Sequence, residues 1–562
     1  MPTRSAWRLR DTLAAAALFL ASAAFTLWQN TRVAVLWDIT YLLDTSYRIS
    51  LGQLPYRDFP FAHAPLTFLV HALIIRLFGR VYYPHLICAA LEAGAATLLT
   101  WRFLLALLKP LSDRAWFLAT LLAAPLIVLG IYGVYPHPIY DSDAILVVLL
   151  ALVLFRRSTS STAARPVLGL LTGAACVFPL FFKQNIGLPF LFVTLAAAAA
   201  IAIARSRQRI GIWPQLWLFT GAFVTLAAAF LAIHATVGLH NYLYWTITFA
   251  RQRRLPGLAV MLSTYRQASL LWTIPAAIAA LILLRRANRW ARPLAILLLA
   301  APFLWTIASL ALTEDPADRA GQLLSLWPHI LILSAALAVW SLRPQKLAAD
   351  PTLQPFIPAI LLVAIHGAFL SQQLWGSTYA LWPLLALLLA VLLVQVPTIA
   401  RPMAVVIAAT FLLCGGLYAT SHERLSYVYL DGPRIAATLP ELRGLTTPGP
   451  WIPGFEELVR VTNAEIPAND GILLLPGEDP FYFATGRVPQ FPILLIDPAT
   501  DPYTPMQTRD LARTRNIRWL IVSRQTQLTG PPHPDLAEIA HVLEQDFTPY
   551  RTLTNYTIYR RK

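Results

Sequence analysis

The stretch Leu36-Trp37-Asp38-Ile39-Thr40-Tyr41 follows directly on the first apolar segment of the chain. A polar and aromatic loop continues through Pro55-Tyr56-Arg57-Asp58 and His63-Ala64-Pro65, where a quick return to apolar sequence would be usual in a membrane protein. If the apolar segment crosses a membrane, Asp38 lies at the outer surface. A carboxylate at the start of such a loop predicts chemistry at that surface.

The composition places most of the chain in lipid. Of its 562 residues, 57% are hydrophobic and only 13% are charged, and the mean hydropathy is +0.58. These values exclude a soluble globular protein of this length. The apolar residues fall into separate runs of about 17–25 residues, each long enough to cross a hydrocarbon core of about 30 Å as a helix. The net charge of +16 sits mainly in short loops, so it indicates topology and no nucleic-acid partner.

The cysteines and the first apolar run each allow one further prediction. Cys88, Cys176 and Cys414 all lie inside apolar runs without metal-binding spacing, which predicts core packing. The first apolar run follows several arginines and lacks a small-residue cleavage site, so we expect a retained helix and no signal peptide.

Hydropathy and loop charge predict a polytopic α-helical membrane protein with about 13 transmembrane helices. The expected spans are 11–29, 83–107, 114–134, 142–155, 166–182, 187–204, 213–236, 268–284, 293–311, 322–342, 354–371, 378–396 and 401–419. The apolar segment 65–79 is short for a span, and we expect it to lie along the interface after another short helix at 41–51.

Loop charge predicts the orientation of these spans. With a cytoplasmic N-terminus, nearly every basic loop cluster falls inside, as the positive-inside rule requires. The clusters are Lys109 and Arg114; Arg156, Arg157 and Arg165; Arg205, Arg207 and Arg209; Arg285, Arg286, Arg289 and Arg292; and Arg343, Lys346 and Arg401. An odd number of spans then places the C-terminus outside.

After about residue 420 the sequence becomes mixed polar with short apolar runs. Residues 471–476 and 517–522 are predicted to be buried strands, 534–546 a helix, and 556–559 a last strand. We therefore expect a transmembrane domain over 1–420, with its first outer loop at 30–82, and an extracytoplasmic α/β domain over 421–562 that is large enough to fold alone.

Four outward-facing segments carry the candidate site residues. The first outer loop holds Asp38, Tyr56, Arg57, Asp58 and His63; the second holds Asp141 and Asp143; and two later segments hold Lys183 and the basic run Arg251, Arg253 and Arg254. Two carboxylates at the start of a helix interact favourably with the positive end of the helix dipole and could share a divalent cation. The alternatives are a helix cap with a solvated charge for the acid pair, and a solvated loop for the basic run.

Acids and cations on one membrane face predict a site for an anionic, phosphorylated lipid. The acids would provide a general base or hold a metal, and the cations would bind phosphate. Glu92, inside the second span, marks either a buried ion pair or a wall of the site. Trp37, Tyr41, Tyr56 and Tyr140 could stack on a sugar or anchor the chain at the interface.

One arrangement of residues resembles a known family. A single span and an early outer acid precede Gly52-x-x-Pro55-Tyr56-Arg57-Asp58-Phe59, His63-Ala64-Pro65-Leu66 and a helix ending Leu77-Phe78-Gly79. This order resembles membrane glycosyltransferases of the GT-C superfamily. The similar branch is bacterial and related to protein O-mannosyltransferases, the aminoarabinose–lipid A transferase and Rgt-type enzymes.

The resemblance assigns roles to several residues. It places Asp38 at the position of the family's catalytic acid, commonly the first of an Asp-Glu pair, although here Ile39 follows it. Asp141 and Asp143 match an acidic motif of the second outer loop, which in some relatives helps to bind a metal. Lys183-Gln184-Asn185-Ile186-Gly187 also recurs in bacterial relatives. A divalent metal ion is the one cofactor that the resemblance suggests.

The function that this resemblance implies is sugar transfer from a polyprenyl-phosphate donor to a glycolipid, glycan or protein acceptor. The reaction would occur at the outer face of a bacterial inner membrane. Asp38 would act on the acceptor hydroxyl, and Lys183 with Arg251, Arg253 and Arg254 would neutralise the lipid phosphate. Three alternatives stay open: a transporter or flippase for a lipid-linked sugar, a polymerase or ligase of another fold, and a non-catalytic relative.

Overall fold

The computed structural model describes most of the chain. The described residues are 9–33, 36–132, 138–159, 165–286, 288–313, 325–370, 380–420, 423–424, 428–429, 433–497, 501–525, 527 and 534–562. Their structure is mostly helical, with strands confined to the C-terminal part of the chain.

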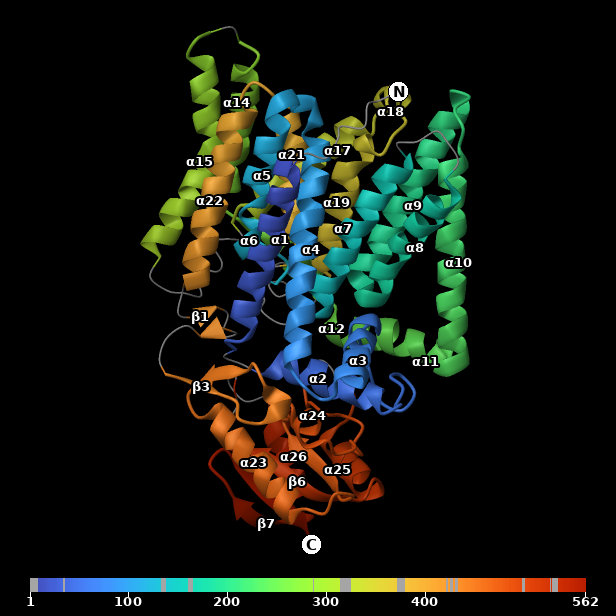
Figure 1. Cartoon of the computed structure of the whole chain (residues 1–562), viewed down its shortest axis with the longest axis vertical. Helices are drawn as coiled ribbons and strands as arrows, with labels where there is room; N and C mark the ends of the chain where they lie inside the picture. Colours follow the sequence, from blue (N-terminus) through green and yellow to red (C-terminus); the bar gives the residue numbers. More distant parts are fainter. Residues whose placement is uncertain are drawn as a thin grey trace.

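A bundle of apolar helices forms the larger part of the molecule (Figure 1). Its helices are α1 (Leu9–Asn30), α4 (Tyr83–Leu107), α5 (Ala115–Ala123), α6 (Leu126–Leu129), α7 (Tyr140–Thr159), α8 (Pro166–Phe182), α9 (Gln184–Arg207), α10 (Trp213–Thr236), α14 (Leu270–Leu283), α15 (Ala291–Leu312), α17 (Trp327–Ser341), α19 (Ile357–Ala368), α21 (Trp382–Val394) and α22 (Ala400–Thr420). Each predicted span therefore contains helix. Among the described residues, α1, α4, α9, α10 and α15 are long and apolar enough to cross a membrane, and the total of about 13 spans stays a prediction.

The predicted span 114–134 differs from the structure. It is divided into α5 and α6, and Pro125 stands at the break between them. Proline has no backbone N–H to donate and its ring crowds the preceding turn, so a continuous helix through this position is disfavoured.

The basic helix ends gather at one end of the bundle. Side chains there connect segments far apart in sequence: Arg156 donates to the Ala106 carbonyl at 3.3 Å, and Gln208 donates to the Ala348 carbonyl at 2.6 Å. Arg205 also donates to the carbonyl of Thr159. The segments predicted to share the cytoplasmic side thus meet one another, and the first loop and the C-terminal segment lie at the opposite end (Figure 1).

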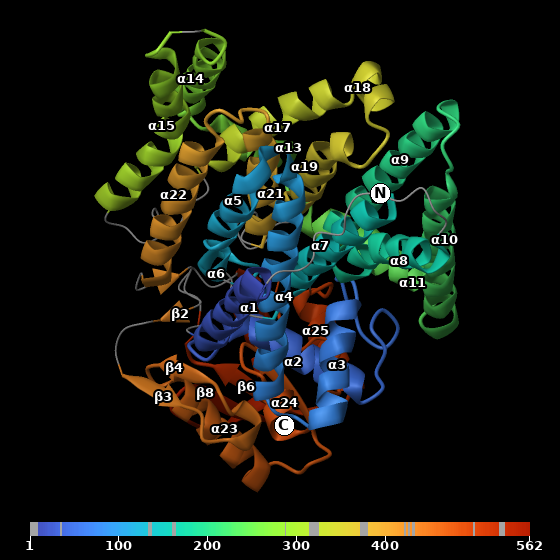
Figure 2. The same ribbon diagram turned by 45° about the horizontal axis from the view of Figure 1, so that its top comes forward.

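Two helices separate the bundle from the C-terminal segment (Figures 1 and 2). They are α2 (Trp37–Ser50) and α3 (Leu66–Phe78), which confirms helical structure where short interfacial helices were predicted. Their position relative to a membrane stays a prediction.

Among its described residues, the C-terminal segment combines three sheets with short helices, and the first sheet pairs β1 (Glu423–Arg424) with β2 (Val428–Tyr429). Its other elements are β3 (Arg434–Ala436), β4 (Thr446–Pro448), α23 (Trp451–Glu465), β5 (Gly471–Leu475), α24 (Phe481–Thr485), α25 (Pro505–Thr514), β6 (Ile517–Ser523), α26 (Pro534–Glu544), β7 (Phe547–Thr552) and β8 (Tyr556–Arg561). β3 pairs with β4, and the largest sheet has the order β5-β6-β8-β7, in which only β5 and β6 run parallel. The strands and helix predicted here are confirmed. Every residue of β5 is buried, as expected for an apolar strand covered on both faces.

The first loop and the C-terminal segment share one hydrophobic core. Ile39, Leu43 and Tyr47 recur along one face of α2 and pack in the same cluster as Phe483 and Trp519. Spacings of three and four residues place side chains on one side of a helix. Leu42 and Ile49 instead belong to the core of the bundle. Because α2 contributes to both cores, it joins the two parts of the molecule.

Asp44 makes a polar contact across this junction. Its carboxylate accepts backbone hydrogen bonds from Phe483 at 2.7 Å and Tyr482 at 3.2 Å, at the start of α24. Burial disfavours the charged form and raises the pKa of Asp44 to about 8, although these two N–H groups partly oppose the shift. These contacts give Asp44 a structural role at the junction.

The pKa shift predicts a pH dependence of stability. Between the ordinary carboxyl pKa near 4 and about pH 8, folded Asp44 keeps a proton that the unfolded chain releases. The contribution of Asp44 to the stability of the folded state is therefore complete at low pH and is lost as the pH rises through about 8. We expect the thermal unfolding midpoint to fall from pH 7 to pH 9, and Asp44→Asn to flatten this decline.

Two further buried acids define the window for this measurement. Burial raises the pKa of Glu478 to about 7 and that of Asp479 to about 6. Their contributions to stability are therefore lost at lower pH than that of Asp44. Asp510→Asn, at an exposed position of α25, is the matched control and should keep the wild-type slope. An unchanged slope in Asp44→Asn would contradict the role assigned to Asp44.

Candidate functional site

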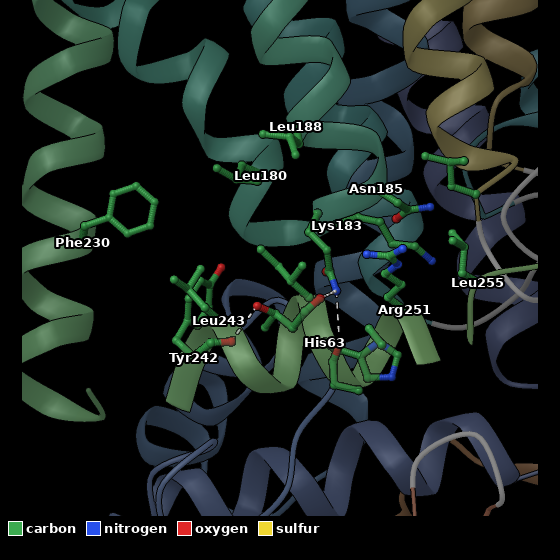
Figure 3. Close-up of a pocket in the computed structure, with 16 residues that line it drawn as sticks. His63, Leu180, Lys183, Asn185, Leu188, Phe230, Tyr242, Leu243, Arg251 and Leu255 are labelled. Atoms are coloured by element: carbon green, nitrogen blue, oxygen red, sulfur yellow. Dashed lines mark hydrogen bonds between the residues drawn. The ribbon is translucent and has the colours of Figure 1, made fainter. Parts of the chain in front are cut away.

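A cavity of about 320 Å³ lies where the first loop meets the bundle (Figure 3). Its polar wall includes His63 from the first loop, Lys183 and Gln184 from the turn between α8 and α9, and Arg251. The remaining lining is mostly apolar and includes Leu180, Leu188, Phe230, Leu243 and Leu255. Figure 3 shows Lys183, Arg251 and His63 gathered on one side of the cavity, away from Phe230.

The turn between α8 and α9 positions Lys183. The residue has an extended backbone, with φ −147° and ψ 105°, between the two helices. Its carbonyl accepts the Gly187 N–H at 2.8 Å, so α9 begins immediately. A Cβ at Gly187 would lie 2.1 Å from the Leu180 backbone nitrogen, which means that only glycine allows α8 and α9 to approach so closely here.

Lys183 pairs with Asp141, the first acid of the second-loop motif. The ammonium Nζ lies 2.8 Å from Oδ2 and 2.7 Å from Oδ1 of Asp141. Both side chains are largely buried, with 9% and 7% of their surface exposed. Nζ also lies 4.4 Å from the ring centroid of Tyr140, where the π face attracts a cation. The structure therefore brings two sequence-predicted charges together at the cavity.

Asp143, the second acid, has different partners. Its Oδ1 accepts a hydrogen bond from Tyr132 at 2.7 Å, and its other oxygen accepts one from Thr67. The same Tyr132 hydroxyl lies 2.7 Å from Glu92 Oε2. A single phenol proton serves only one of two carboxylates at a time, so Glu92 and Asp143 share the Tyr132 hydroxyl. Glu92 thus belongs to a buried hydrogen-bond network and does not line the cavity described above.

This arrangement does not fit a divalent metal on the acid pair. The Asp141 oxygens face Lys183 and the Asp143 oxygens face hydroxyl groups. The part of the chain that the structure describes also contains no cluster of three or more His, Cys, Asp or Glu residues suited to a metal ion. Residues 133–137 of the second loop lie outside the described residues.

Aromatic side chains connect the cavity to α2. The His63 ring lies 4.6 Å from Tyr140 and 5.4 Å from Tyr41, measured between centroids. Tyr56 is buried, donates a hydrogen bond to the His63 carbonyl at 2.6 Å, and contacts Tyr242 edge-on at 5.2 Å. His63 thus forms part of the cavity wall, and Tyr56 supports the backbone that carries it.

Arg57 and Asp58 lie at the edge of this loop. Their side chains form a partly exposed ion pair at 2.8 Å, and Asp58 also accepts the backbone N–H of Leu54 at 2.7 Å. The guanidinium lowers the pKa of Asp58 below its usual value. These contacts close the turn at residues 54–58 and keep Asp58 charged.

Asp38 occupies the first turn of α2 and is partly buried. It is not among the residues that line the cavity. Tyr41, three residues further on, lies on the same side of the helix and contacts His63. Asp38 is therefore one helical turn from the aromatic side chains that border the cavity, and its catalytic role stays a prediction.

The basic segment predicted as a loop is helical. Residues 239–254 form α11 (Leu239–Leu243), the π-helical turn η2 (Tyr244–Phe249) and α12 (Ala250–Arg254). The buried positions Tyr242, Thr246 and Phe249 recur every three or four residues, a helical signal that the basic residues obscured. Arg251 lines the cavity, and the side chains of Arg253 and Arg254 lie outside the described part of the structure.

Sequence reasoning missed Tyr242 and Thr246 and the contacts that Gln184 makes. Gln184 donates to the carbonyls of Ala62 at 3.1 Å and Thr246 at 3.3 Å, which ties the first loop to η2. Tyr242 and Thr246 line the cavity from this helical segment. Their helical spacing was the available signal for Tyr242 and Thr246, whereas nothing local in the sequence identifies the partners of Gln184.

No protein-family model and no curated protein matches the chain. The crystal structure of ArnT from Cupriavidus metallidurans bound to undecaprenyl phosphate is similar, with 11% identity, a TM-score of 0.46, and coverage of 99% of this chain and 98% of ArnT. The apo structure of the same protein gives 13% identity, a TM-score of 0.47, and coverage of 98% and 96%.

The archaeal oligosaccharyltransferase AglB from Archaeoglobus fulgidus, in complex with an inhibitory peptide and a dolichol-phosphate, has 10% identity and a TM-score of 0.43. That match covers 92% of this chain and 70% of AglB.

The buried ion pair predicts a specific pattern of stability. Lys183→Met leaves the Asp141 carboxylate buried and unpaired, which should lower the free energy of unfolding by about 3–5 kcal/mol. Replacing both partners, as in Lys183→Met/Asp141→Leu, removes both charges and should recover most of this loss. Thermal unfolding of the purified variants measures both effects. A double variant that is as unstable as Lys183→Met would contradict the pairing.

Proposed function

We propose that this protein is a membrane glycosyltransferase. It would move a sugar from a polyprenyl-phosphate donor to an acceptor at the outer face of the inner membrane. The observation that carries the proposal is the buried Lys183–Asp141 pair at the polar side of an otherwise apolar cavity, with Arg251 in the same wall. The sequence resemblance to GT-C glycosyltransferases supports the same function.

The cavity suits a lipid phosphate. Apolar side chains of α8, α9 and α10 form much of its wall, which fits hydrocarbon. Lys183, Arg251 and Asp141 together carry a formal charge of +1, which favours an anion. An ammonium has three N–H donors, so Lys183 can bind a phosphate oxygen while its pairing with Asp141 keeps it in place.

The aromatic residues beside the cavity suit the sugar. Tyr41, Tyr56 and Tyr140 come from three different segments and surround His63. Tyr41 and Tyr140 are partly exposed and would stack on the sugar of a phosphate-linked donor, whereas the buried Tyr56 would support them. Trp37 adjoins Asp38 at the start of α2 and could provide a further ring.

Asp38 is the proposed general base. It would take the proton from the acceptor hydroxyl as the hydroxyl oxygen attacks the anomeric carbon of the sugar. The bond from this carbon to the phosphate oxygen breaks, and polyprenyl phosphate leaves with the added negative charge. Lys183 and Arg251 would stabilise that charge as it develops. The steps require no metal ion.

The domain assignment forms part of this proposal. Residues 1–420 would form the catalytic transmembrane domain of a bacterial inner-membrane protein with a cytoplasmic N-terminus. Residues 421–562 would lie in the periplasm and hold α2, which carries Asp38, through the shared core. With this orientation, the end of the bundle that holds the cavity and α2 would be the outer face, and the reaction would be confined to it.

One observation favours a second function, transport of a lipid-linked sugar. Glu92 of α4 and Asp143 of α7 share the hydroxyl of Tyr132. Buried ionisable residues inside membrane helices often mark transport pathways. Movement of a labelled lipid-linked sugar across vesicles without any sugar transfer would support this alternative over the transferase.

The first functional prediction concerns Asp38. In membranes supplied with radiolabelled polyprenyl-phosphate sugars, Asp38→Asn should lower transfer by about 100-fold or more, because general-base catalysis contributes about 10²–10⁴-fold. Asp510→Asn, an exposed acid in α25, should transfer at the wild-type rate. Full activity of Asp38→Asn at normal expression would exclude Asp38 as the base.

A second functional prediction separates phosphate binding from folding. Lys183→Met/Asp141→Leu should fold but lose most transfer, because it lacks the buried cation. Arg251→Gln should raise KM for the donor by about 10–100-fold, the effect of losing a charged hydrogen bond of about 1.5–3 kcal/mol. Initial rates at varied donor concentration measure both changes. Unchanged donor KM in both variants would place the phosphate elsewhere.

A further inference from the structure

A second cavity lies away from the candidate site. Its volume is about 410 Å³, and it is enclosed by α14, α15, α17, α21 and α22. None of its lining residues lines the first cavity. Most of the lining is Leu, Ile, Ala, Val and Phe, and the polar exceptions include Arg285 and Gln395. The mechanism proposed above does not use this space.

The cavity runs lengthwise between the helices. Its lining includes residues from Leu326 to Trp340, which spans nearly all of α17, and from Thr273 to Arg285 along α14. Fourteen residues of helix rise about 21 Å. This length exceeds half of a hydrocarbon core of about 30 Å. The shape therefore matches an extended acyl chain lying parallel to the helices.

One end of the cavity is strongly basic. Arg285 lines it just after α14 ends, and the exposed Arg286 and Arg289 follow in the connection to α15. The sequences of the five enclosing helices and of residues 284–290 contain no Asp or Glu. The helices that line the cavity therefore bring positive charge and no carboxylate of their own to this end, which favours an anionic ligand.

We propose that this cavity binds an anionic phospholipid, with an acyl chain between α14, α15 and α17 and its phosphate on Arg285. Basic pockets between transmembrane helices on the cytoplasmic side are a known setting for anionic lipid head groups. The basic end lies with the helix ends that loop charge predicts to be cytoplasmic. The bound lipid would hold α14 and α15 against the rest of the bundle.

The test measures binding of phosphatidylglycerol by purified, delipidated full-length protein in nanodiscs of phosphatidylcholine. Titrated phosphatidylglycerol should raise the unfolding temperature, because a ligand that binds the folded state stabilises it. Arg285→Gln should weaken this binding about tenfold, the loss expected for one charged hydrogen bond. Arg286→Gln, at the next position and outside the cavity lining, should change it less than twofold.

A second pair of variants tests the chain slot. Ala336 is exposed and lines the cavity, whereas its exposed neighbour Ala335 does not. Ala336→Phe should fill the slot and lower phosphatidylglycerol binding at least tenfold, and Ala335→Phe should bind like wild type. If Ala336→Phe does not fold, phosphatidylglycerol with progressively shorter chains tests the same point on wild-type protein, because a slot predicts weaker binding with each shortening.

Three outcomes would overturn the proposal. Equal losses in Arg285→Gln and Arg286→Gln would indicate diffuse attraction of lipid to a basic surface. Wild-type binding by Ala336→Phe, or binding that is independent of chain length, would show that no chain enters the cavity. Equal stabilisation by phosphatidylcholine and phosphatidylglycerol would remove the role of Arg285. Each result is independent of sugar transfer, so the proposed function could fail without affecting this one.

Discussion

The burial of α2 on two sides is the constraint on which the site depends. One face of this helix packs with the C-terminal segment and another with the bundle, while Asp44 binds two backbone N–H groups at the start of α24. A helix held on both sides has little freedom to rotate or shift. The two residues proposed to meet the acceptor and the sugar, Asp38 and Tyr41, are therefore fixed relative to the cavity by contacts far from it in sequence.

A second constraint fixes the cation of the site. The turn between α8 and α9 is so tight that Gly187 contacts the backbone of α8, and Lys183 at this turn reaches Asp141 at the start of α7. A buried ammonium is costly without a partner, and the carboxylate supplies one while Tyr140 covers the charge. The pair thus keeps a positive group at the edge of an apolar space, where an anionic lipid head has few competing solvent contacts.

Local pattern was enough to predict the helices, because an apolar run of span length encodes its own structure. The predicted span at 83–107 has the bounds of α4, and those at 166–182 and 213–236 have the bounds of α8 and α10. The pattern failed at Pro125, where one apolar run contains two helices. It also failed at 239–254, where basic residues concealed a helical repeat of buried positions. At Pro125 the apolar run hid the effect of the proline. At 239–254 the basic residues hid the helical periodicity of the buried positions.

For the site, the sequence determined which chemical groups are present and on which face of the bundle they gather, since loop charge and span length together fix the order of the crossings. Only the tertiary structure decided their partners. Asp141 and Asp143 are two residues apart in the first turn of α7, yet one pairs with Lys183 and the other binds Tyr132 and Thr67, because residues i and i+2 do not share a face of a helix. Such pairings depend on how helices distant in sequence pack, and no local pattern records that packing.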